Sequence, residues 1–277
     1  MSEEQPPVPV IIRPSGNPES RSGLFRLLGI PIAIYCLWMI VTVLFEGDLR
    51  LFQSADPRGI IVYTVFACII TGMIIPVYCI RESFVTGAVN MFQIGFWPVR
   101  RTFYACFLTI FFGYMAMVLF SPFGTDTFTF GYAFLLLLPT AIASVTVCWV
   151  LLGTHIQAVV RGGGTILSIA AGSLITAWLF CLTSFVHSPA VHPQTALAGF
   201  LVLGLAAAVF FFAVRDIYAA SIFVAFGLTF VMADRIGIPG TQAVMPVVYG
   251  SALLGVITLI GIHLYFARNF RTIKLPV

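Results

Sequence analysis

Three glycines and a threonine follow an arginine between Arg161 and Thr165, and this combination could bind a phosphate group. A Walker-type loop needs Gly-x-x-x-x-Gly-Lys-Ser/Thr directly after a strand. Here no lysine follows the glycines, and the segments on both sides are apolar. We therefore interpret Gly162, Gly163 and Gly164 as a tight turn, because glycine has the backbone freedom to reverse the chain.

Two histidines, His187 and His192, flank a Ser-Pro-Ala-Val sequence and could bind a metal ion or sense pH. Protein zinc sites use at least three protein ligands, and no third ligand is evident beside this pair. The six cysteines all lie in apolar runs without a Cys-x-x-Cys pair. Neither a disulfide framework nor a zinc site is therefore expected, and no cofactor is predicted.

Proline interrupts two apolar segments, at Pro139 and Pro246. Each proline removes a backbone hydrogen bond, so the freed carbonyl needs a polar partner or a water-lined cavity. The polar side chains that follow the two prolines are Thr140, Ser144, Tyr249 and Ser251. These two groups are the candidates for the lining of a polar path.

Small residues recur every four positions at Ser168, Gly172 and Thr176 and therefore share one face of a helix. Small-residue spacing of this kind lets membrane helices approach closely. A row of hydroxyls that faces a solute path is the alternative reading. Both readings stay open at this point.

The elements that position these residues are membrane helices. Apolar residues make up 60% of the 277 residues, charged residues only 9%, and the mean hydropathy is +1.05. A soluble domain carries about a quarter charged residues. The composition therefore indicates an integral membrane protein. Residues 1–23 are polar and rich in Pro, Ser and Glu, which is typical of a disordered tail.

Since a helix crosses the hydrocarbon core in about 20 residues, the chain is expected to be all-α with eight spans. The expected spans are 24–45, 60–80, 102–122, 132–153, 165–187, 196–214, 217–233 and 243–266. Only Arg215 and Asp216 separate the sixth from the seventh. We expect two helices there, because the combined apolar run is too long for one crossing.

The orientation follows from the 14 Lys and Arg residues, of which eleven lie on the side of both termini and three on the other. The eleven are Arg13, Arg21, Arg26, Arg81, Arg100, Arg101, Arg161, Arg215, Arg268, Arg271 and Lys274. Positive residues favour the cytoplasm, so both termini are predicted to be cytoplasmic and the protein to lie in the cell membrane.

The sequence divides into four parts. The cytoplasmic tail (1–23) precedes two helices (24–80), a cytoplasmic segment (81–101) and a six-helix membrane core (102–277). Within the third part, Phe96 and Trp97 stand beside Arg100 and Arg101. This pattern predicts a short interfacial segment whose aromatic side chains dip into the bilayer while the arginines face anionic lipid.

Charged side chains are absent from the centres of the expected spans, and the acids near the membrane edges are Glu46, Asp48, Asp126, Asp216 and Asp234. The sequence contains neither Gly-x-Ser-x-Gly nor His-Glu-x-x-His. Nothing therefore indicates an activated nucleophile or a metal-bound water, and we expect no enzyme.

From residue 98 onward the order of spans and loops resembles the acetate/succinate uptake transporter family. Its Gly-Asn-Thr-Phe-Gly turn corresponds to residues 163–167, and its Phe-rich fourth span to "VFFFAVRD" (209–216). Its fifth span resembles "IFVAFGLTFVMADRIGIPG" (222–240), and its tail "NFRTIKLPV" (269–277). The hallmark Asn-Pro-x-Pro-x-Gly-Leu has no counterpart, since "WPVRRTF" stands near its place. The resemblance implies six spans per protomer and adds Thr165 and Ser173 as path positions.

The sequence thus favours a transporter or channel for a small weakly acidic or weakly polar solute, such as a short carboxylate. Because no arginine lies deep in a span, a carboxylate would cross as the protonated acid or be held by helix N-termini. The alternative is a non-transporting membrane subunit that packs against partner proteins through its small-residue faces. The expected partners are the lipid bilayer, a small solute and further copies of the chain, with no nucleic acid.

Overall fold

A computed structural model describes residues 25–47, 51–54, 56–85, 89, 91–121, 126–187, 193–233, 236 and 244–269. Every regular element in these ranges is a helix, as the composition predicts. The elements are η1 (Phe25–Gly29), α2 (Ile30–Thr42), η2 (Val43–Gly47), α3 (Leu51–Ser54), α4 (Pro57–Tyr63), η3 (Thr64–Ile74), α5 (Ile75–Val85), α6 (Met91–Ile94), α7 (Val99–Phe120), α8 (Thr127–Ser144), η4 (Val145–Gly153), α9 (Thr154–Val160), η5 (Arg161–Gly163), α10 (Thr165–Leu182), α11 (Ser184–His187), α12 (Pro193–Val214), α13 (Ile217–Val231) and α14 (Met245–Asn269).

Seven of the described helices are long and apolar enough to cross a membrane. The segment expected as the seventh span is the shorter apolar helix α13, of 15 residues. The break expected before it is present, because α12 ends at Val214 and Arg215 adopts a φ of 55°. The chain is therefore a multi-span helical membrane protein, while eight crossings and cytoplasmic termini stay predictions. The tail lies outside the described residues.

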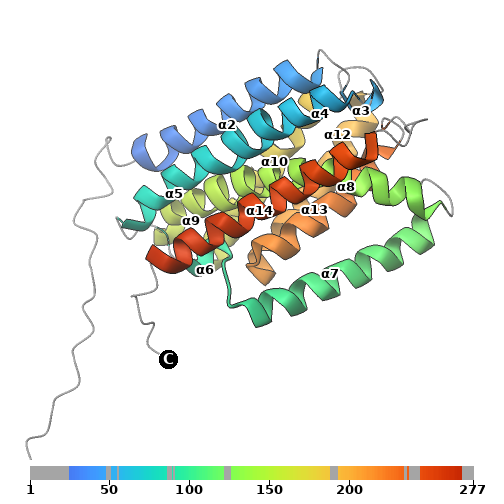
Figure 1. Cartoon of the computed structure of the whole chain (residues 1–277). Coiled ribbons are helices and arrows are strands. Elements are labelled where there is room, and N and C mark those ends of the chain that lie inside the picture. Colours follow the sequence, from blue (N-terminus) through green and yellow to red (C-terminus); the bar gives the residue numbers. More distant parts are fainter. Residues whose placement is uncertain are drawn as a thin grey trace, which may run out of the picture.

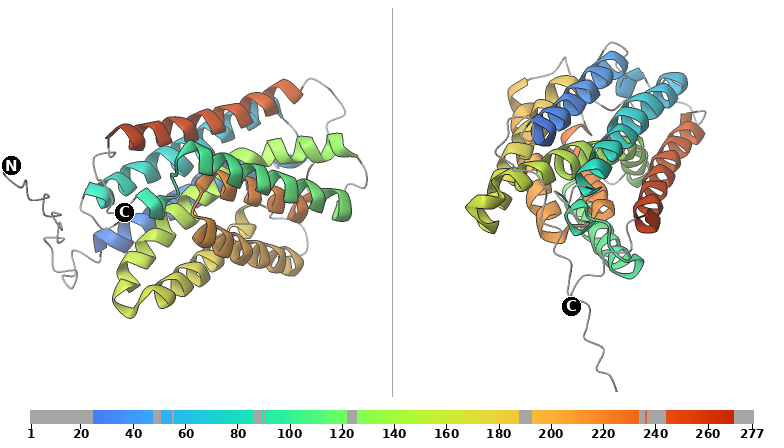
Figure 2. Two further views of the ribbon diagram at one scale, coloured as in Figure 1. Left: turned by 90° about the horizontal axis from the view of Figure 1, so that it is seen from below. Right: turned by 90° about the vertical axis from the view of Figure 1, so that its left-hand side faces the viewer.

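The helices form a bundle of antiparallel neighbours (Figure 1). Its centre is the continuous helix α8–η4–α9, which is contacted by α2, α5, α10, α13 and α14. Of its most apolar 18 residues, 94% are buried inside the protein. The other long helices surround it, as the end-on view of Figure 2 shows. Polar side chains on α8–η4–α9 are therefore held away from lipid by the rest of the chain.

Helix α7 lies at the edge of the bundle (Figure 1), and only 11% of its most apolar residues are buried. It packs chiefly against α13. At the contact point, a Cβ added to Gly113 would come within 2.4 Å of the Phe226 ring. Only glycine allows this approach without a shift of the ring. The periphery of the bundle thus contains a helix whose packing on α13 depends on a close approach at Gly113.

The segment before α7 differs from the predicted interfacial arrangement. Phe96 is buried in the protein and stacks on His263 at 4.8 Å between ring centroids. The indole of Trp97 donates to the carbonyl oxygen of Arg215 at 2.5 Å, and the Arg101 guanidinium lies 3.4 Å above its ring. Because protein surfaces cover these aromatic groups, Phe96 in particular does not dip into the bilayer. The prediction of lipid contact is wrong for this side chain.

The glycine turn has the geometry that the sequence predicts. Helix α9 ends at Val160, η5 covers Arg161–Gly163, and α10 begins at Thr165. Gly164 has a φ of 96°, a conformation that residues with a Cβ rarely adopt. The glycines therefore reverse the chain between two packed helices.

Candidate functional site

Four buried side chains from four elements meet inside the bundle and form what we call the Glu46 cluster: Glu46, Tyr63, Cys68 and Thr140. The Tyr63 hydroxyl lies 3.0 Å from Oγ1 of Thr140, and the Glu46 carboxyl group is close enough to Tyr63 to interact with it electrostatically. The Cys68 Sγ lies 3.8 Å from the same Thr140 oxygen. Glu46 is only 4% exposed. A buried carboxyl group thus lies beside a group of hydroxyl and thiol side chains that includes one on the central helix.

Local sequence signals place Tyr63 in this cluster. Asp56 caps α4, since its Oδ2 accepts a hydrogen bond from the Gly59 N–H at 2.8 Å, and Pro57 occupies the first turn. Phe52 is buried and packs edge-on against the Tyr63 ring at 5.8 Å. The short helix α3 therefore covers the cluster at the predicted external end of the bundle.

Thr140 differs from two other hydroxyl residues of the central helix. Ser144 and Thr146 each donate to the carbonyl oxygen four residues earlier, at 2.8 Å. The Thr140 hydroxyl instead faces Tyr63, on a different span. It follows Pro139, whose missing N–H leaves the Leu135 carbonyl without its usual helical donor. The kink-forming proline and the interhelical hydroxyl thus occupy adjacent positions.

The chemistry available in the Glu46 cluster is proton exchange and hydrogen bonding. A carboxyl group can bind or release a proton, and hydroxyl and thiol groups can both donate and accept. Ionisable groups are expensive inside a membrane and commonly mark substrate or proton pathways. The cluster is therefore the strongest candidate site among the described residues.

A second polar group lies at the opposite, predicted cytoplasmic end, and we call it the junction cluster: Thr102, Gln157, Arg215 and Asp216. Asp216 is fully buried and caps α13, because it accepts from the Ala219 N–H at 3.0 Å and from the Thr102 hydroxyl at 2.7 Å. Arg215 donates to Oε1 of Gln157 at 3.0 Å, and burial lowers its pKa from the ordinary value. These bonds join α7, α9, α12 and α13 at their ends.

A buried histidine connects α5 to the central helix. The Nδ1 of His155 lies 2.6 Å from the Leu151 carbonyl oxygen, which can only accept, so Nδ1 carries the hydrogen. Its Nε2 lies 2.6 Å from the Ser83 hydroxyl. Both ring nitrogens therefore have partners within the bundle, which fixes the imidazole as a contact between helices.

The small-residue face of α10 packs inside the protein. Ser168, Gly172, Ser173 and Thr176 are all buried. A Cβ on Gly172 would lie 3.0 Å from Cγ of Gln157 and 3.4 Å from Cζ of Phe212. The Thr176 hydroxyl donates to the Gly172 carbonyl of its own helix at 2.6 Å. This geometry supports the packing reading of the face, and a solute path along it stays a prediction.

Two predicted path positions do not join the buried groups. Thr165 is exposed at the start of α10, and Tyr249 is 54% exposed. Tyr249 precedes Ser251 by two residues, or about 200° around a helix, so the buried Ser251 faces the opposite way. Neighbouring Gly255 lies against α8, where its Cβ would be 3.6 Å from Pro139. Of the path positions predicted on α8 and α14, Pro139 lies at the α8–α14 contact and Ser251 is buried, whereas Tyr249 is exposed.

The predicted histidine pair cannot be placed as a site. His192 and the side chain of His187 lie outside the described residues. Elsewhere in the described ranges, no group of three or more His, Cys, Asp or Glu side chains gathers as metal ligands would.

Sequence reasoning identified Thr140 but missed its neighbours. Glu46 was visible only as an acid near a membrane edge, and nothing in the pattern marked Tyr63 or Cys68. Comparison of the chain with protein-family models, curated proteins and solved structures finds no match. The geometry of the site must therefore carry the functional argument.

Proposed function

We propose that the chain is a membrane transporter for a small weakly acidic or weakly polar solute, and that the solute meets the Glu46 cluster on its way. The observation that carries this proposal is a carboxyl group, 4% exposed, beside Tyr63, whose hydroxyl lies 3.0 Å from a hydroxyl on the central helix.

The backbone around the cluster supports the same reading. Cys68 lies in η3 and Ser144 directly precedes η4, and both elements are π-helical stretches. The stretch η1, at the start of α2, has the same helix type, so this feature does not by itself mark the site. Pro139 lies in α8, the helix that contacts η3 and continues into η4. Membrane transporters commonly bind solutes where helices are interrupted near the middle of the bilayer.

The proposed chemistry follows from the side chains present. A weak acid would cross as the protonated species, since its charge would be expensive in this environment. The hydroxyl groups of Tyr63 and Thr140 would hydrogen-bond its polar oxygen atoms. Glu46 would exchange the proton that accompanies the solute. A short carboxylic acid fits this set of donors and acceptors, in keeping with the resemblance to the acetate/succinate uptake family.

The alternative of a non-transporting subunit finds less support. That reading requires small-residue faces that are available to partner proteins. In the described chain these faces are used internally: a Cβ on Gly72 would lie 2.5 Å from Ala143, and one on Gly204 would lie 2.9 Å from the Ala177 carbonyl oxygen. The close helix approaches at Gly72 and Gly204 are therefore contacts within the chain's own bundle.

The test is solute flux into proteoliposomes that contain the purified chain. Labelled acetate and succinate are compared with a neutral solute of similar size, with and without an inward proton gradient. We expect uptake of a short carboxylate above that of empty liposomes, with an increase under the gradient. Uptake no faster than in empty liposomes for every solute would contradict the proposal.

A further inference from the structure

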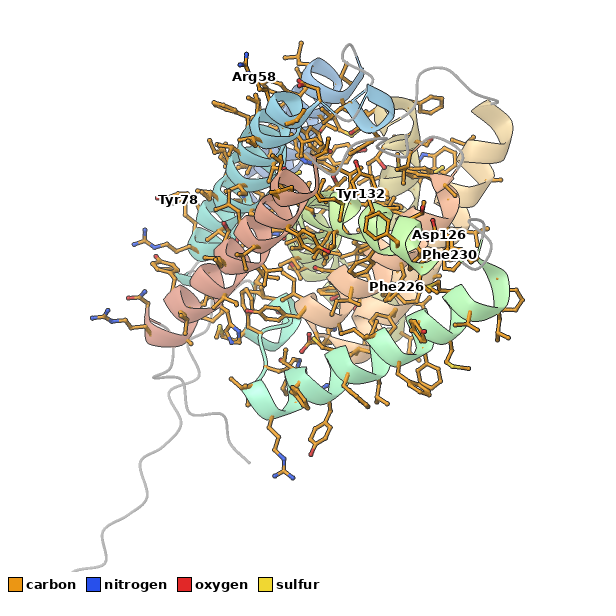
Figure 3. The ribbon with its side chains drawn as sticks, turned by 45° about the vertical axis from the view of Figure 1, so that its right-hand side comes forward. Arg58, Tyr78, Asp126, Tyr132, Phe226 and Phe230 are labelled. Atoms are coloured by element: carbon orange, nitrogen blue, oxygen red, sulfur yellow. The ribbon has the colours of Figure 1, made fainter. Side chains whose placement is uncertain are left out.

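We infer that an anionic phospholipid of the predicted cytoplasmic leaflet binds between α7 and α12, with its acyl chains in the groove between these helices and its headgroup at Arg100 and Arg101. This site is separate from the Glu46 cluster and does not depend on the transport proposal. Figure 3 shows the region, where Phe226 and Phe230 of α13 lie beside α7.

The groove is open at the surface, has an apolar lining and a volume of about 620 Å³. Its floor is α13, with Phe223, Phe226 and Phe230, and its walls are α7 and α12. The one hydroxyl in the lining, on Thr109, donates to the Ala105 carbonyl of its own helix at 2.8 Å. The groove therefore offers contact area to a hydrocarbon chain and no polar group to a hydrophilic ligand.

The groove is shorter than the full thickness of the bilayer. Its lining on α7 runs from Ala105 to Ala116. At about 1.5 Å per residue this is about 16 Å, close to half of the roughly 30 Å hydrocarbon core. A transmembrane helix from another protein would need the full thickness. The lining begins six residues into α7, about 9 Å from its start, which leaves room for a lipid headgroup at Arg100 and Arg101 while the acyl chain enters the groove.

Charge at one end of the groove selects the headgroup. Val214 is the last residue of α12 in the groove lining. Its carbonyl oxygen accepts a hydrogen bond from Nη2 of Arg101 at 3.0 Å. The exposed side chains of Arg100 and Arg101 lie within the first turn of α7. Arginine donors and a helix N-terminus both favour a phosphate. The nearby Asp216 is fully buried and bonded to Thr102, so it does not face this end.

Native mass spectrometry of the full chain with equal amounts of phosphatidylglycerol and phosphatidylcholine of matched acyl chains tests the inference. We expect phosphatidylglycerol to be retained preferentially. Arg100→Gln and Arg101→Gln should each lower the ratio of the two bound lipids about fivefold, which corresponds to about 1 kcal/mol for one arginine near the headgroup. Arg81→Gln is the control, because this exposed arginine lies at the same end but away from the groove.

A second set of variants tests the acyl part. Ala105→Phe and Ala116→Phe fill opposite ends of the groove and should reduce the retention of both lipids. Met115→Phe, on an exposed part of α7 outside the lining, should leave retention unchanged. Equal retention of the two lipids by the unmodified chain, or retention that the filling variants do not alter, would overturn the inference. Lipid-free dimers that only the filling variants dissociate would overturn it in favour of a second copy in the groove.

Discussion

The Glu46 cluster and the junction cluster both bury a carboxyl group, but they bond it differently. In the junction cluster, Asp216 accepts from a backbone N–H and from Thr102 at the start of α13. In the Glu46 cluster, the carboxyl group meets Tyr63, which continues to Thr140 on the central helix. Asp216 caps the start of a helix, whereas Glu46 lies beside side chains that can exchange protons.

This difference separates a structural acid from a functional one. A capping carboxylate stabilises the first turn of its helix and fixes the angle at which the chain enters. Side chains that hydrogen-bond each other across spans can rearrange without loss of the backbone pattern. We therefore expect substitutions at Asp216 to alter stability and substitutions in the Glu46 cluster to alter flux.

The largest expected effect on stability is that of Asp216→Ala. Loss of the cap costs about 1 kcal/mol, and the unpaired Thr102 hydroxyl adds roughly 1–3 kcal/mol, so a total of about 2–4 kcal/mol is expected. Denaturant unfolding in detergent measures this change. The matched control is Asp126→Ala, which removes the exposed cap of α8. Equal losses in the two variants would contradict the structural role of the junction.

The next effect is that of Gly172→Leu. The new side chain would meet Gln157 and Phe212, and overpacking of this kind costs roughly 1–3 kcal/mol. Stability and flux are measured on the same protein, with Gly250→Leu as the control because a Cβ there meets nothing within 4 Å. Lost flux at unchanged stability would show that the α10 face lines a path and does not merely pack.

A smaller effect on stability is expected for Tyr63→Phe and for Thr140→Val. Each removes one partner of a hydrogen bond whose net contribution is about 1 kcal/mol. Flux should fall much more than stability does, because these hydroxyls are proposed to bind the solute. Tyr104→Phe, on an exposed face of α7, serves as the control in both assays. Unaltered flux in both cluster variants would remove Tyr63 and Thr140 from the site.

The smallest expected effect is on the pH dependence of the free energy of unfolding. The Thr129 hydroxyl donates to Asp126 and holds the pKa of that exposed carboxyl group below its ordinary value. A lowered pKa in the folded state stabilises the protein above the ordinary pKa of about 4, and this contribution disappears as the pH falls below it. Thr129→Val should flatten the pH dependence of stability near pH 4. A steeper dependence in the variant would contradict this assignment.

Hydropathy alone predicted the helical segments, because the cost of unpaired backbone groups in lipid leaves few alternatives. The charged pair Arg215 and Asp216 predicted the break between two helices, and the glycines predicted the turn at Gly164. These features depend on local sequence, on charge and on glycine. The helix that forms the centre of the bundle could not be recognised, since α7 and α8 are similarly apolar.

The site depends on helix rotation, which the sequence does not specify. Glu46 and Tyr63 are separated by a connection that reverses the chain, so their contact appears only when α4 is packed. Phe96 looked like a lipid anchor because the pattern shows an aromatic residue beside arginines. Its actual partner, His263, comes from the last helix. Long-range pairing is therefore the part that required the structure.

The central claim is that Glu46 exchanges a proton during transport, and flux through Glu46→Gln tests it most directly. Glutamine keeps the size and a hydrogen-bonding head but cannot ionise. The control is Glu82→Gln, which alters an exposed acid of α5. We expect Glu46→Gln to lose at least about tenfold in gradient-driven uptake, which corresponds to a barrier raised by about 1.4 kcal/mol, with an unchanged free energy of unfolding. Uptake by Glu46→Gln equal to that of Glu82→Gln, with its dependence on the proton gradient intact, would contradict the claim.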